Sequence, residues 1–373
     1  MGLNASALPD FPWDSLTPFV ERASAHPDGA INLSVGTPVD PTPAVVRDAL
    51  VAAADASGYP ATHGTAALRA AVVEWFARRR GVANVDPSSV LPTVGSKEFV
   101  GLLPSLLELG PGDVVVHPAV AYPTYDVGAR LAGAMPLAAD GVADWKGNAA
   151  VKLVWVNSPS NPTGAVAGVE ELRAIVEAAR AIGAVVASDE CYAELAWEEP
   201  WSSQGVPSIL DPRVCGGSHD GLLAVYSLSK QSNLAGYRAA FVAGDGAVVA
   251  RLLEVRKHIG MIMPAPVQAA MVAALGDDAH VAEQRLVYGA RRETLSGALV
   301  AAGFSIDDSV AGLYLWATRG EDAWASVAWL AERGIVVAPG SFYGPSGAKH
   351  VRVALTASDE HIDAAALRLV NEQ

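Results

Sequence analysis

Residues 151–190, VKLVWVNSPSNPTGAVAGVEELRAIVEAARAIGAVVASDE, carry the pattern that decides the fold. A short apolar run from Leu153 to Val156 is followed by apolar residues at helical spacing between Leu172 and Ile182. A second short run, Ala184 to Ala187, begins directly after Gly183. Runs that are apolar on both faces and separated by a helix indicate parallel strands in a sheet covered by helices on both sides. The stretch therefore predicts a strand, helix and strand unit of an α/β protein.

The same pattern continues outward from this stretch. Further apolar runs lie at residues 114–116, 222–226 and 239–243. Thr65 is typical of a helix cap, and it precedes an apolar helical face formed by Leu68, Val72, Trp75 and Phe76. The Pro- and Gly-rich stretch 198–220 predicts a surface loop within the same domain.

After about Asp278 the pattern changes to a long helical stretch, followed by short strands near residues 313–317 and 351–355. We therefore predict a large domain over residues 39–278, in which a mostly parallel sheet lies between helices. A smaller α/β domain is predicted from residues 1–38 and 279–373.

Composition and charge limit the classes of partner. Of 373 residues, 51% are hydrophobic, so the chain can bury a large core. The net charge of −14 opposes binding to nucleic acid or to an anionic membrane surface, and we expect neither partner. The chain has two cysteines and an N-terminus without a signal-peptide pattern, which indicates a cytoplasmic protein. The spacing of histidines and cysteines matches no metal site, and no metal is expected.

Two further patterns concern membranes and modification. The longest uncharged run, residues 259–276, contains Pro264 and Pro266 and predicts a loop followed by a buried helix. Gly2, Asn4 and Ser6 fit patterns for myristoylation and glycosylation, but these patterns are short enough to arise by chance.

Three of the predicted strands run into polar residues at their carboxyl ends, where open α/β sheets bind ligands. These segments are NSPSNPTG at 157–164, SDECY at 188–192 and SLSK at 227–230. Each segment alone also fits an ordinary role: a turn at 161–164, a helix cap at Asp189, a solvated side chain at Lys230. Because the pattern recurs at three strand ends, it favours a site where an amide, a carboxylate, a phenol and an amine converge.

Three motifs in this order resemble those of the class I/II aminotransferases of fold type I. They are NPTG at 161–164, Asp189 three residues before Tyr192, and SLSK followed by GYR at 236–238. The resemblance extends from VGTP at 35–38 to VRV at 351–353. It implies pyridoxal 5′-phosphate as cofactor, and amino acids and 2-oxo acids as small-molecule substrates. It also implies a homodimer with shared active sites.

The needs of this cofactor give roles to the catalytic residues, which we expect to be Lys230, Asp189 and Tyr192. Lys230 would be linked covalently to the cofactor and, once displaced by substrate, would act as the base that moves a proton. Asp189 would face the pyridine nitrogen and keep it protonated, so that the ring can accept electrons. The resemblance places Asn161 and Tyr192 at the phenolic oxygen of the ring.

The phosphate of the cofactor requires hydrogen-bond donors and positive charge. Gly95, Ser96 and Lys97 follow an extended run and open an apolar helix, so backbone N–H groups and the helix dipole can hold an anion there. Lys97 also fits a solvated residue of the first helical turn. The phosphate site would be completed by Ser227, Ser229 and Arg238.

Two tyrosines receive cofactor-binding roles from the resemblance. Tyr122 matches the aromatic residue that stacks on the ring, although it also fits an ordinary packed tyrosine. Tyr59 matches a position that reaches the phosphate of the neighbouring subunit, so a monomer could not complete the site.

The substrate is expected to meet Arg352, Gly36 and Asn161. Arg352 stands in an apolar strand, where an unpaired guanidinium is costly, so an anion should meet it. By resemblance this anion is the substrate α-carboxylate; a structural ion pair is the alternative. Gly36 matches the N-terminal substrate loop of the family, and Asn161 is placed by resemblance beside the bound substrate.

Longer stretches resemble a subgroup, the actinobacterial N-succinyldiaminopimelate aminotransferases: residues 11–14, 33–41, 121–133, 157–164, 188–192, 256–275 and 338–356. This resemblance implies amino transfer between glutamate and N-succinyl-2-amino-6-oxopimelate, in lysine and diaminopimelate biosynthesis. Another amino-acid aminotransferase or a carbon–sulfur lyase of the same fold would use the same residues. A regulator is disfavoured, because the 35 residues before Gly36 are not basic.

A succinylated substrate carries several negative charges, and a chain of net charge −14 repels it unless local cations outweigh that field. Candidates for the distal end are Lys97, Arg256, Lys257 and His258. The last three also fit the end of a solvated helix, where cations interact favourably with the helix dipole.

Overall fold

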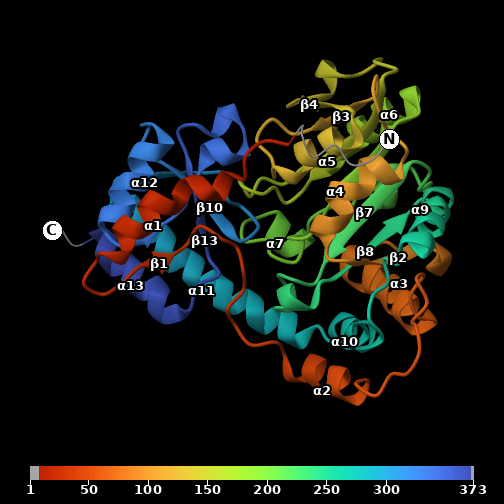
Figure 1. Cartoon of the computed structure of the whole chain (residues 1–373), viewed down its shortest axis with the longest axis horizontal. Coiled ribbons are helices and arrows are strands. Elements are labelled where there is room, and N and C mark those ends of the chain that lie inside the picture. The colour runs from red at the N-terminus through yellow and green to blue at the C-terminus, as the bar shows by residue number, and fades with distance from the viewer. Residues whose placement is uncertain (1–7, 371–373) are drawn as a thin grey trace.

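The structure is a computed structural model that describes residues 8–370; the patterns at Gly2, Asn4 and Ser6 lie outside this range. Figure 1 shows a larger lobe built around a sheet and a smaller lobe that contains both the first and the last helices of the described chain. The two lobes correspond in outline to the predicted domains, while the boundaries at residues 38/39 and 278/279 stay a prediction.

The larger lobe contains a seven-stranded sheet in the order β2-β8-β7-β6-β5-β3-β4. The strands are β2 (Val90–Val94), β3 (Val114–His117), β4 (Met135–Ala138), β5 (Val151–Asn157), β6 (Val185–Asp189), β7 (Leu222–Ser227) and β8 (Ala239–Gly244). Neighbouring strands are parallel except for the two pairs that involve β8. The mostly parallel sheet is therefore confirmed, and the five apolar runs form strands, apart from Ala184, which precedes β6.

Helices cover both faces of this sheet because both faces of its strands are apolar. Val154 and Val156 of β5 share a core with α2 (Ala44–Ala52), α3 (Ala66–Arg80), α6 (Val169–Ile182), α8 (Pro212–Cys215) and α10 (Ala265–Gly276). Leu153 and Trp155 point to the opposite core, which contains α4 (Ser96–Leu106), α5 (Thr124–Ala132) and α9 (Gly246–Ile259). Because successive side chains of a strand point to opposite faces, the sheet has one buried apolar layer on each face.

The ends of two helices follow the local sequence signals. The hydroxyl of Thr65 accepts a hydrogen bond of 3.1 Å from the backbone N of Leu68, which confirms the predicted cap of α3. Helix α6 ends at Gly183, whose φ of 70° is left-handed and costs glycine little.

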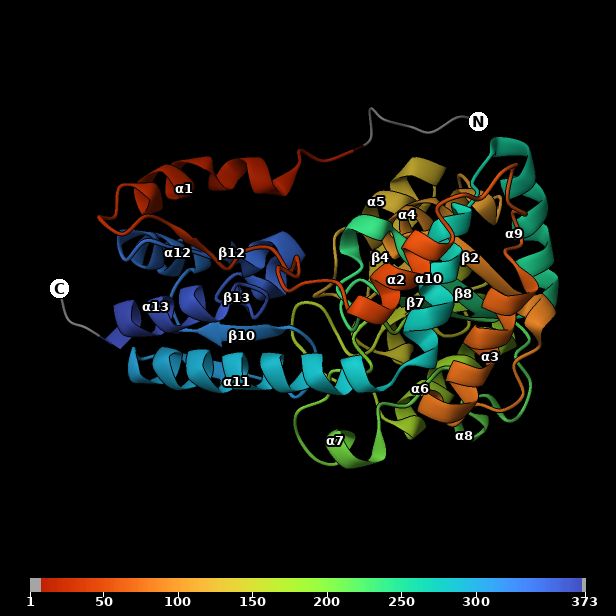
Figure 2. The ribbon, with the colours of Figure 1, turned by 90° about the horizontal axis from the view of Figure 1, so that it is seen from below.

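The smaller lobe combines the two ends of the described chain. Strand β1 (Ile31–Asn32) pairs in parallel with β11 (Ile335–Val336). An antiparallel sheet has the order β12 (Ala338–Pro339), β13 (Val351–Ala354), β10 (Tyr314–Thr318), β9 (Ser305–Asp307). The helices are α1 (Thr17–Ser24), α11 (Ala279–Ala301), α12 (Ala323–Glu332) and α13 (Asp359–Val370). Figure 2 shows α1 beside α12, where Phe19 stacks on Trp324 at 5.4 Å between ring centroids.

Part of the stretch 198–220 is core, so the prediction of a surface loop is wrong there. Helix α7 (Trp201–Gln204) and helix α8 form within it, and residues 206–211 are buried. The backbone N of Ile209 donates a 2.8 Å hydrogen bond to the buried carboxylate of Glu190. The apolar residues between the prolines bury against the core that contains α6, which loop composition alone does not reveal.

The uncharged run 259–276 forms a loop followed by α10, as predicted. Within residues 8–370, no helix is both long enough and apolar enough to cross a membrane. The remaining short elements are the 3₁₀ helices η2 (Pro12–Leu16), η3 (Pro87–Ser89), η4 (Val142–Asp144), η5 (Ala235–Tyr237), η6 (Gly340–Tyr343) and η7 (Pro345–Gly347).

Candidate active site

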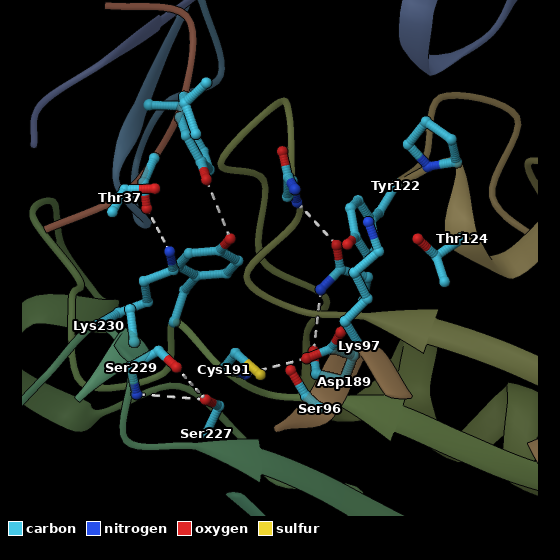
Figure 3. Close-up of a pocket in the computed structure, with 18 of the residues that line it drawn as sticks. Thr37, Ser96, Lys97, Tyr122, Thr124, Asp189, Cys191, Ser227, Ser229 and Lys230 are labelled. Atoms are coloured by element: carbon cyan, nitrogen blue, oxygen red, sulfur yellow. Dashed lines mark hydrogen bonds between the residues drawn. The ribbon is translucent and has the colours of Figure 1, made fainter. Parts of the chain in front are cut away.

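A cavity of about 470 Å³ lies at the carboxyl ends of β5, β6 and β7 and reaches β10 and β13 of the smaller lobe. Most of the predicted site residues line it: Gly36, Ser96, Lys97, Tyr122, Asn161, Asp189, Tyr192, Ser227, Ser229, Lys230, Arg238 and Arg352. Figure 3 shows how side chains from separate strands and loops converge on this cavity. The three polar strand ends therefore meet, as the topology of parallel strands requires.

Lys230 lies just beyond the end of β7, and its amine reaches across to the smaller lobe. The Nζ atom donates a hydrogen bond to the backbone carbonyl of Gly36, in the loop after β1. The amine is therefore held in the cavity between the large sheet and the N-terminal segment (Figure 3). This is the position from which it can act on a ligand that contacts both lobes.

Asp189 is a buried carboxylate at the end of β6. Its oxygens accept hydrogen bonds from the hydroxyl of Tyr125 at 3.0 Å and from the backbone N of Cys191 at 3.3 Å. Burial raises the pKa of Asp189 above its usual value, although these two partners act in the opposite direction. A protonated ring nitrogen in front of it would favour the ionised carboxylate.

Tyr125 was not among the predicted site residues. It packs on Trp155, with ring centroids 5.0 Å apart, and so aims its hydroxyl at Asp189. The only signal in the sequence was its place three residues after Tyr122, which puts both tyrosines near the start of α5.

The part of the cavity near Ser96, Ser227 and Ser229 has the chemistry of an anion site. The hydroxyl of Ser227 donates to that of Ser229 at 2.8 Å, and α4 begins at Ser96 beside them. Gly95 has a φ of 75°, and a Cβ there would clash with the guanidinium of Arg238. Hydroxyls, the N-terminus of a helix and a guanidinium form a donor set suited to a phosphate.

Arg352 of β13 is buried beside the cavity. Its guanidinium donates to Oδ1 of Asn161 at 2.8 Å and to the backbone carbonyl of Ser34 at 2.6 Å, while its Nε is buried and has no partner in the described part of the chain. Within residues 8–370 no carboxylate lies at ion-pair distance from it. Because this buried guanidinium has no carboxylate partner in that range, we interpret it as a binding group for an anionic ligand and not as part of a structural ion pair.

Asn157, the last residue of β5, links the strand ends to each other. Its Nδ2 donates to the backbone carbonyl of Asp189 at 3.0 Å, and its Oδ1 accepts from the backbone N of Asn161 at 2.7 Å. It belongs to the NSPSNPTG segment, but it was not predicted as a site residue. Its contacts show how the loop that carries Asn161 is held over β6.

Some predicted residues do not reach the cavity of this chain. Tyr59 is 98% exposed, and Lys257 forms an exposed ion pair of 2.6 Å with Glu254. His258 lies on the same exposed last turn of α9. Arg256 is fully buried and donates to Glu98 at 3.1 Å, so the prediction of Arg256 as a free cation for the substrate is wrong.

The mouth of the cavity is aromatic. Phe11 and Trp13, from the segment before α1, line it together with Tyr122, and the Phe11 and Trp13 ring centroids are 5.7 Å apart. Lys97 lies there, with its Nζ 6.0 Å from the ring centroids of both Phe11 and Tyr122. The sequence motif FPWD did not by itself indicate that these rings face the site.

The profile of the family "aminotransferase class I and II" matches residues 28–369. The chain belongs to this family. It is 59% identical to the 4-dedimethylamino-4-oxo-anhydrotetracycline transaminase OxyQ of Streptomyces rimosus, over 97% of this chain and 99% of that protein. It is also 59% identical to the probable aminotransferase Rv1178 of Mycobacterium tuberculosis, over 99% of this chain and 86% of that protein.

Solved structures of aminotransferases have the same fold. A probable N-succinyldiaminopimelate aminotransferase of Thermus thermophilus superposes with a TM-score of 0.84. It is 31% identical to the chain, and the match covers 96% of this chain and 99% of that one. The expected fold type I architecture is thereby confirmed.

Aminotransferases of this family depend on pyridoxal phosphate, and the cavity fits that group. The hydroxyl and guanidinium donors suit its phosphate, the buried Asp189 suits its ring nitrogen, and Lys230 supplies an amine for its carbonyl carbon. The chain is therefore a pyridoxal phosphate-dependent aminotransferase, which acts on amino acids and 2-oxo acids.

Proposed function

We propose that the chain transfers an amino group between glutamate and N-succinyl-2-amino-6-oxopimelate, as a succinyldiaminopimelate transaminase of lysine and diaminopimelate biosynthesis. The observation that carries the proposal is the charge of the cavity. Its lining includes the basic residues Lys97, Lys230, Arg238 and Arg352, while Asp189 is the acidic one among the described lining residues. In a chain of net charge −14, this is a local site for anions.

Each of these cations has a proposed partner. Arg238 binds the cofactor phosphate, and Lys230 is linked to the cofactor. Arg352 binds the substrate α-carboxylate through the fork of its guanidinium. Lys97, at the mouth of the cavity, then remains for the distal carboxylate of a long substrate such as the succinylated pimelate.

The side chains of this site position the substrate and move one proton. Arg352 and Asn161 orient the α-carboxylate so that the Cα–H bond of the substrate faces Lys230. Once the substrate amine has displaced Lys230 from the cofactor, the Nζ of Lys230 would be a free base, and it would take the proton from Cα. The bound cofactor supplies an electron sink for the charge that develops at Cα, and Asp189 holds a proton on its ring nitrogen. Tyr192 and Asn161 bind its phenolic oxygen.

The similarity to the Thermus thermophilus enzyme, which is described as a probable N-succinyldiaminopimelate aminotransferase, supports this substrate. The higher similarity to OxyQ supports a second candidate, the oxo-anhydrotetracycline in the description of that protein. The rings of Phe11 and Trp13 at the mouth of the cavity favour such an acceptor, whereas Lys97 favours a carboxylate. Values of kcat/KM for both acceptors distinguish the two candidate functions.

If Lys97 binds the distal carboxylate, Lys97→Gln should raise KM for the succinylated acceptor by roughly 10-fold to 100-fold, because one charged hydrogen bond to the substrate is lost. The KM for glutamate should rise less, because the shorter substrate does not extend as far toward the mouth. The KM for alanine, which has no distal carboxylate, should not change. Steady-state kinetics on the three substrates measures this pattern.

The matched control is Lys257→Gln, which removes an exposed lysine on α9 that pairs with Glu254. Its kinetics should equal those of the unaltered enzyme for all three substrates. Equal increases of KM for alanine and the succinylated acceptor in Lys97→Gln would contradict the proposed role.

We also propose that the enzyme is a homodimer in which Tyr59 of each subunit binds the cofactor phosphate of the other; the cytoplasmic location stays a prediction. The 98% exposure of Tyr59 in one chain leaves its hydroxyl free for such a contact. Tyr59→Phe should weaken cofactor binding by about 5-fold to 10-fold, the effect of one hydrogen bond. Cofactor titration by fluorescence checks this.

A hybrid experiment tests whether sites are shared. In a dimer of one Tyr59→Phe subunit and one Lys230→Ala subunit, one site would hold both Lys230 and Tyr59. Co-expressed hybrids should therefore regain activity at limiting cofactor, above that of either parent. Hybrids that are no more active than the mixture of parents would argue against shared sites.

A further inference from the structure

Tyr314 is a buried residue at the start of β10 that lines the cavity and that the roles above do not use. It lies opposite Ala354 in the antiparallel pairing with β13, two residues beyond Arg352. The register of these strands therefore places a phenol and a guanidinium side by side at the cavity wall.

The ring of Tyr314 holds the guanidinium of Arg352. The guanidinium carbon is 3.9 Å from the ring centroid of Tyr314 and 4.9 Å from that of Tyr343. Arg352 is thus in contact with two aromatic faces, an arrangement that is favourable when the cation is desolvated. The closer ring is that of Tyr314.

The hydroxyl of Tyr314 contacts the other half of the site. It lies 3.2 Å from the hydroxyl of Tyr192. It also lies against Gly36, where a Cβ would clash with it, and the carbonyl of Gly36 accepts the hydrogen bond from Lys230. One side chain therefore touches Tyr192, Arg352 and the loop that holds Lys230.

The two phenols differ in acidity because different groups surround them. Burial acts to raise the pKa of Tyr314, but the positive charges of Arg352 and Lys230, with the hydrogen bond to Tyr192, bring it below the usual tyrosine value. Burial and then Tyr314 raise the pKa of Tyr192 well above that value. Either hydroxyl can be the donor in this pair. Tyr192 has one proton, so when that proton goes to the phenolic oxygen of the cofactor, Tyr314 is the donor between the two tyrosines.

The charged and titratable groups that act most strongly on Tyr314 are Arg352, Lys230, Tyr192 and Cys191, and the phenols of Tyr122, Tyr288 and Tyr343 also interact with it. The thiol of Cys191 is buried, and burial raises its pKa well above the usual value, so it stays neutral. The two cations and the neutral Tyr192 therefore set the electrostatic environment of the Tyr314 hydroxyl.

We propose that Tyr314 is a positioning residue that couples the carboxylate end of the site to the cofactor end. Its hydroxyl donates to Tyr192, which frees the proton of Tyr192 for the phenolic oxygen of the cofactor, and its ring holds Arg352 in place for the substrate carboxylate. The proposal rests on the cofactor and substrate roles proposed above for Tyr192 and Arg352.

The test compares Tyr314→Phe with Tyr343→Phe in the cofactor-loaded enzyme, by following the visible absorbance against pH. Without the Tyr314 hydroxyl, Tyr192 donates more weakly, and more negative charge stays on the phenolic oxygen. That charge favours the proton on the nitrogen of Lys230, so the apparent pKa of the absorbance change should rise by about 0.5 to 1 unit. The KM for glutamate should stay nearly unchanged, because the ring remains beside Arg352.

Tyr343→Phe is the matched control, because it removes a buried phenol that also faces Arg352 but whose hydroxyl has no partner in the described chain. Its titration should equal that of the unaltered enzyme. A second variant, Tyr314→Leu, removes the ring as well and should raise KM for glutamate by about 10-fold or more.

An unshifted titration in Tyr314→Phe, or an equal shift in Tyr343→Phe, would overturn the inference about Tyr314 and leave the proposed function standing. If the unaltered enzyme had no visible band that depends on Lys230, the proposed function and this inference would fail together.

Discussion

Lys230→Ala should lose turnover by at least about 10⁴-fold, because the variant lacks both the amine that is linked to the cofactor and the base that moves the proton. The visible absorbance of the cofactor-loaded protein should change to that of cofactor bound without a covalent link. Steady-state kinetics and an absorbance spectrum measure the two effects on one preparation.

The matched control is Lys152→Ala. Lys152 lies at the amino end of β5, and its Nζ donates to the backbone carbonyl of Ala149 at 2.8 Å, away from the cavity. This variant should keep the spectrum and the turnover of the unaltered enzyme. Normal turnover in Lys230→Ala would remove Lys230 from the catalytic role.

Asp189→Ala should lower kcat by at least about 100-fold while cofactor affinity falls much less. The phosphate donors at Ser96, Ser227 and Arg238 remain, but the ring nitrogen is no longer held protonated, so the substrate proton becomes harder to remove. Asp189→Glu should be milder, because it keeps a carboxylate. Kinetics at saturating cofactor, together with a cofactor titration, separates the two effects.

Tyr125→Phe is the control for Asp189→Ala, because it changes the surroundings of the Asp189 carboxylate and keeps the carboxylate itself. It removes the 3.0 Å hydrogen bond from the Tyr125 hydroxyl and leaves Asp189 in place. We expect at most about a 10-fold loss of kcat, the effect of one hydrogen bond.

Full recovery of Asp189→Ala on adding excess cofactor would assign Asp189 to cofactor binding alone.

The sheet and the core of the site could be predicted because they depend on local patterns. Short apolar runs separated by helices predict parallel strands, and parallel strands bring their carboxyl ends to one edge. Asp189 and Lys230 directly follow such runs, so their convergence needs no knowledge of side-chain packing. The same reasoning predicts the anion site at Gly95, which depends on a strand followed by a helix start.

What sequence reasoning missed depends on contacts between distant segments. Arg256 resembles a basic residue at an exposed helix end, but its guanidinium is buried against Glu98, 158 positions away. Tyr314 reaches the site only through the pairing of β10 with β13. Tyr125 acts through the direction of its side chain in a helix. Such features follow from three-dimensional packing and have no periodicity that marks them in advance.

The proposed substrate is tested most directly by an amino-transfer assay with the purified cofactor-loaded enzyme and glutamate as donor. The acceptors are N-succinyl-2-amino-6-oxopimelate, the oxo-anhydrotetracycline, pyruvate and an aromatic 2-oxo acid, and the release of 2-oxoglutarate is measured. We expect kcat/KM for the succinylated acceptor to exceed the others by at least about 10-fold, which is the effect of one charged hydrogen bond at Lys97. A higher kcat/KM for the oxo-anhydrotetracycline or the aromatic 2-oxo acid would contradict the proposed substrate.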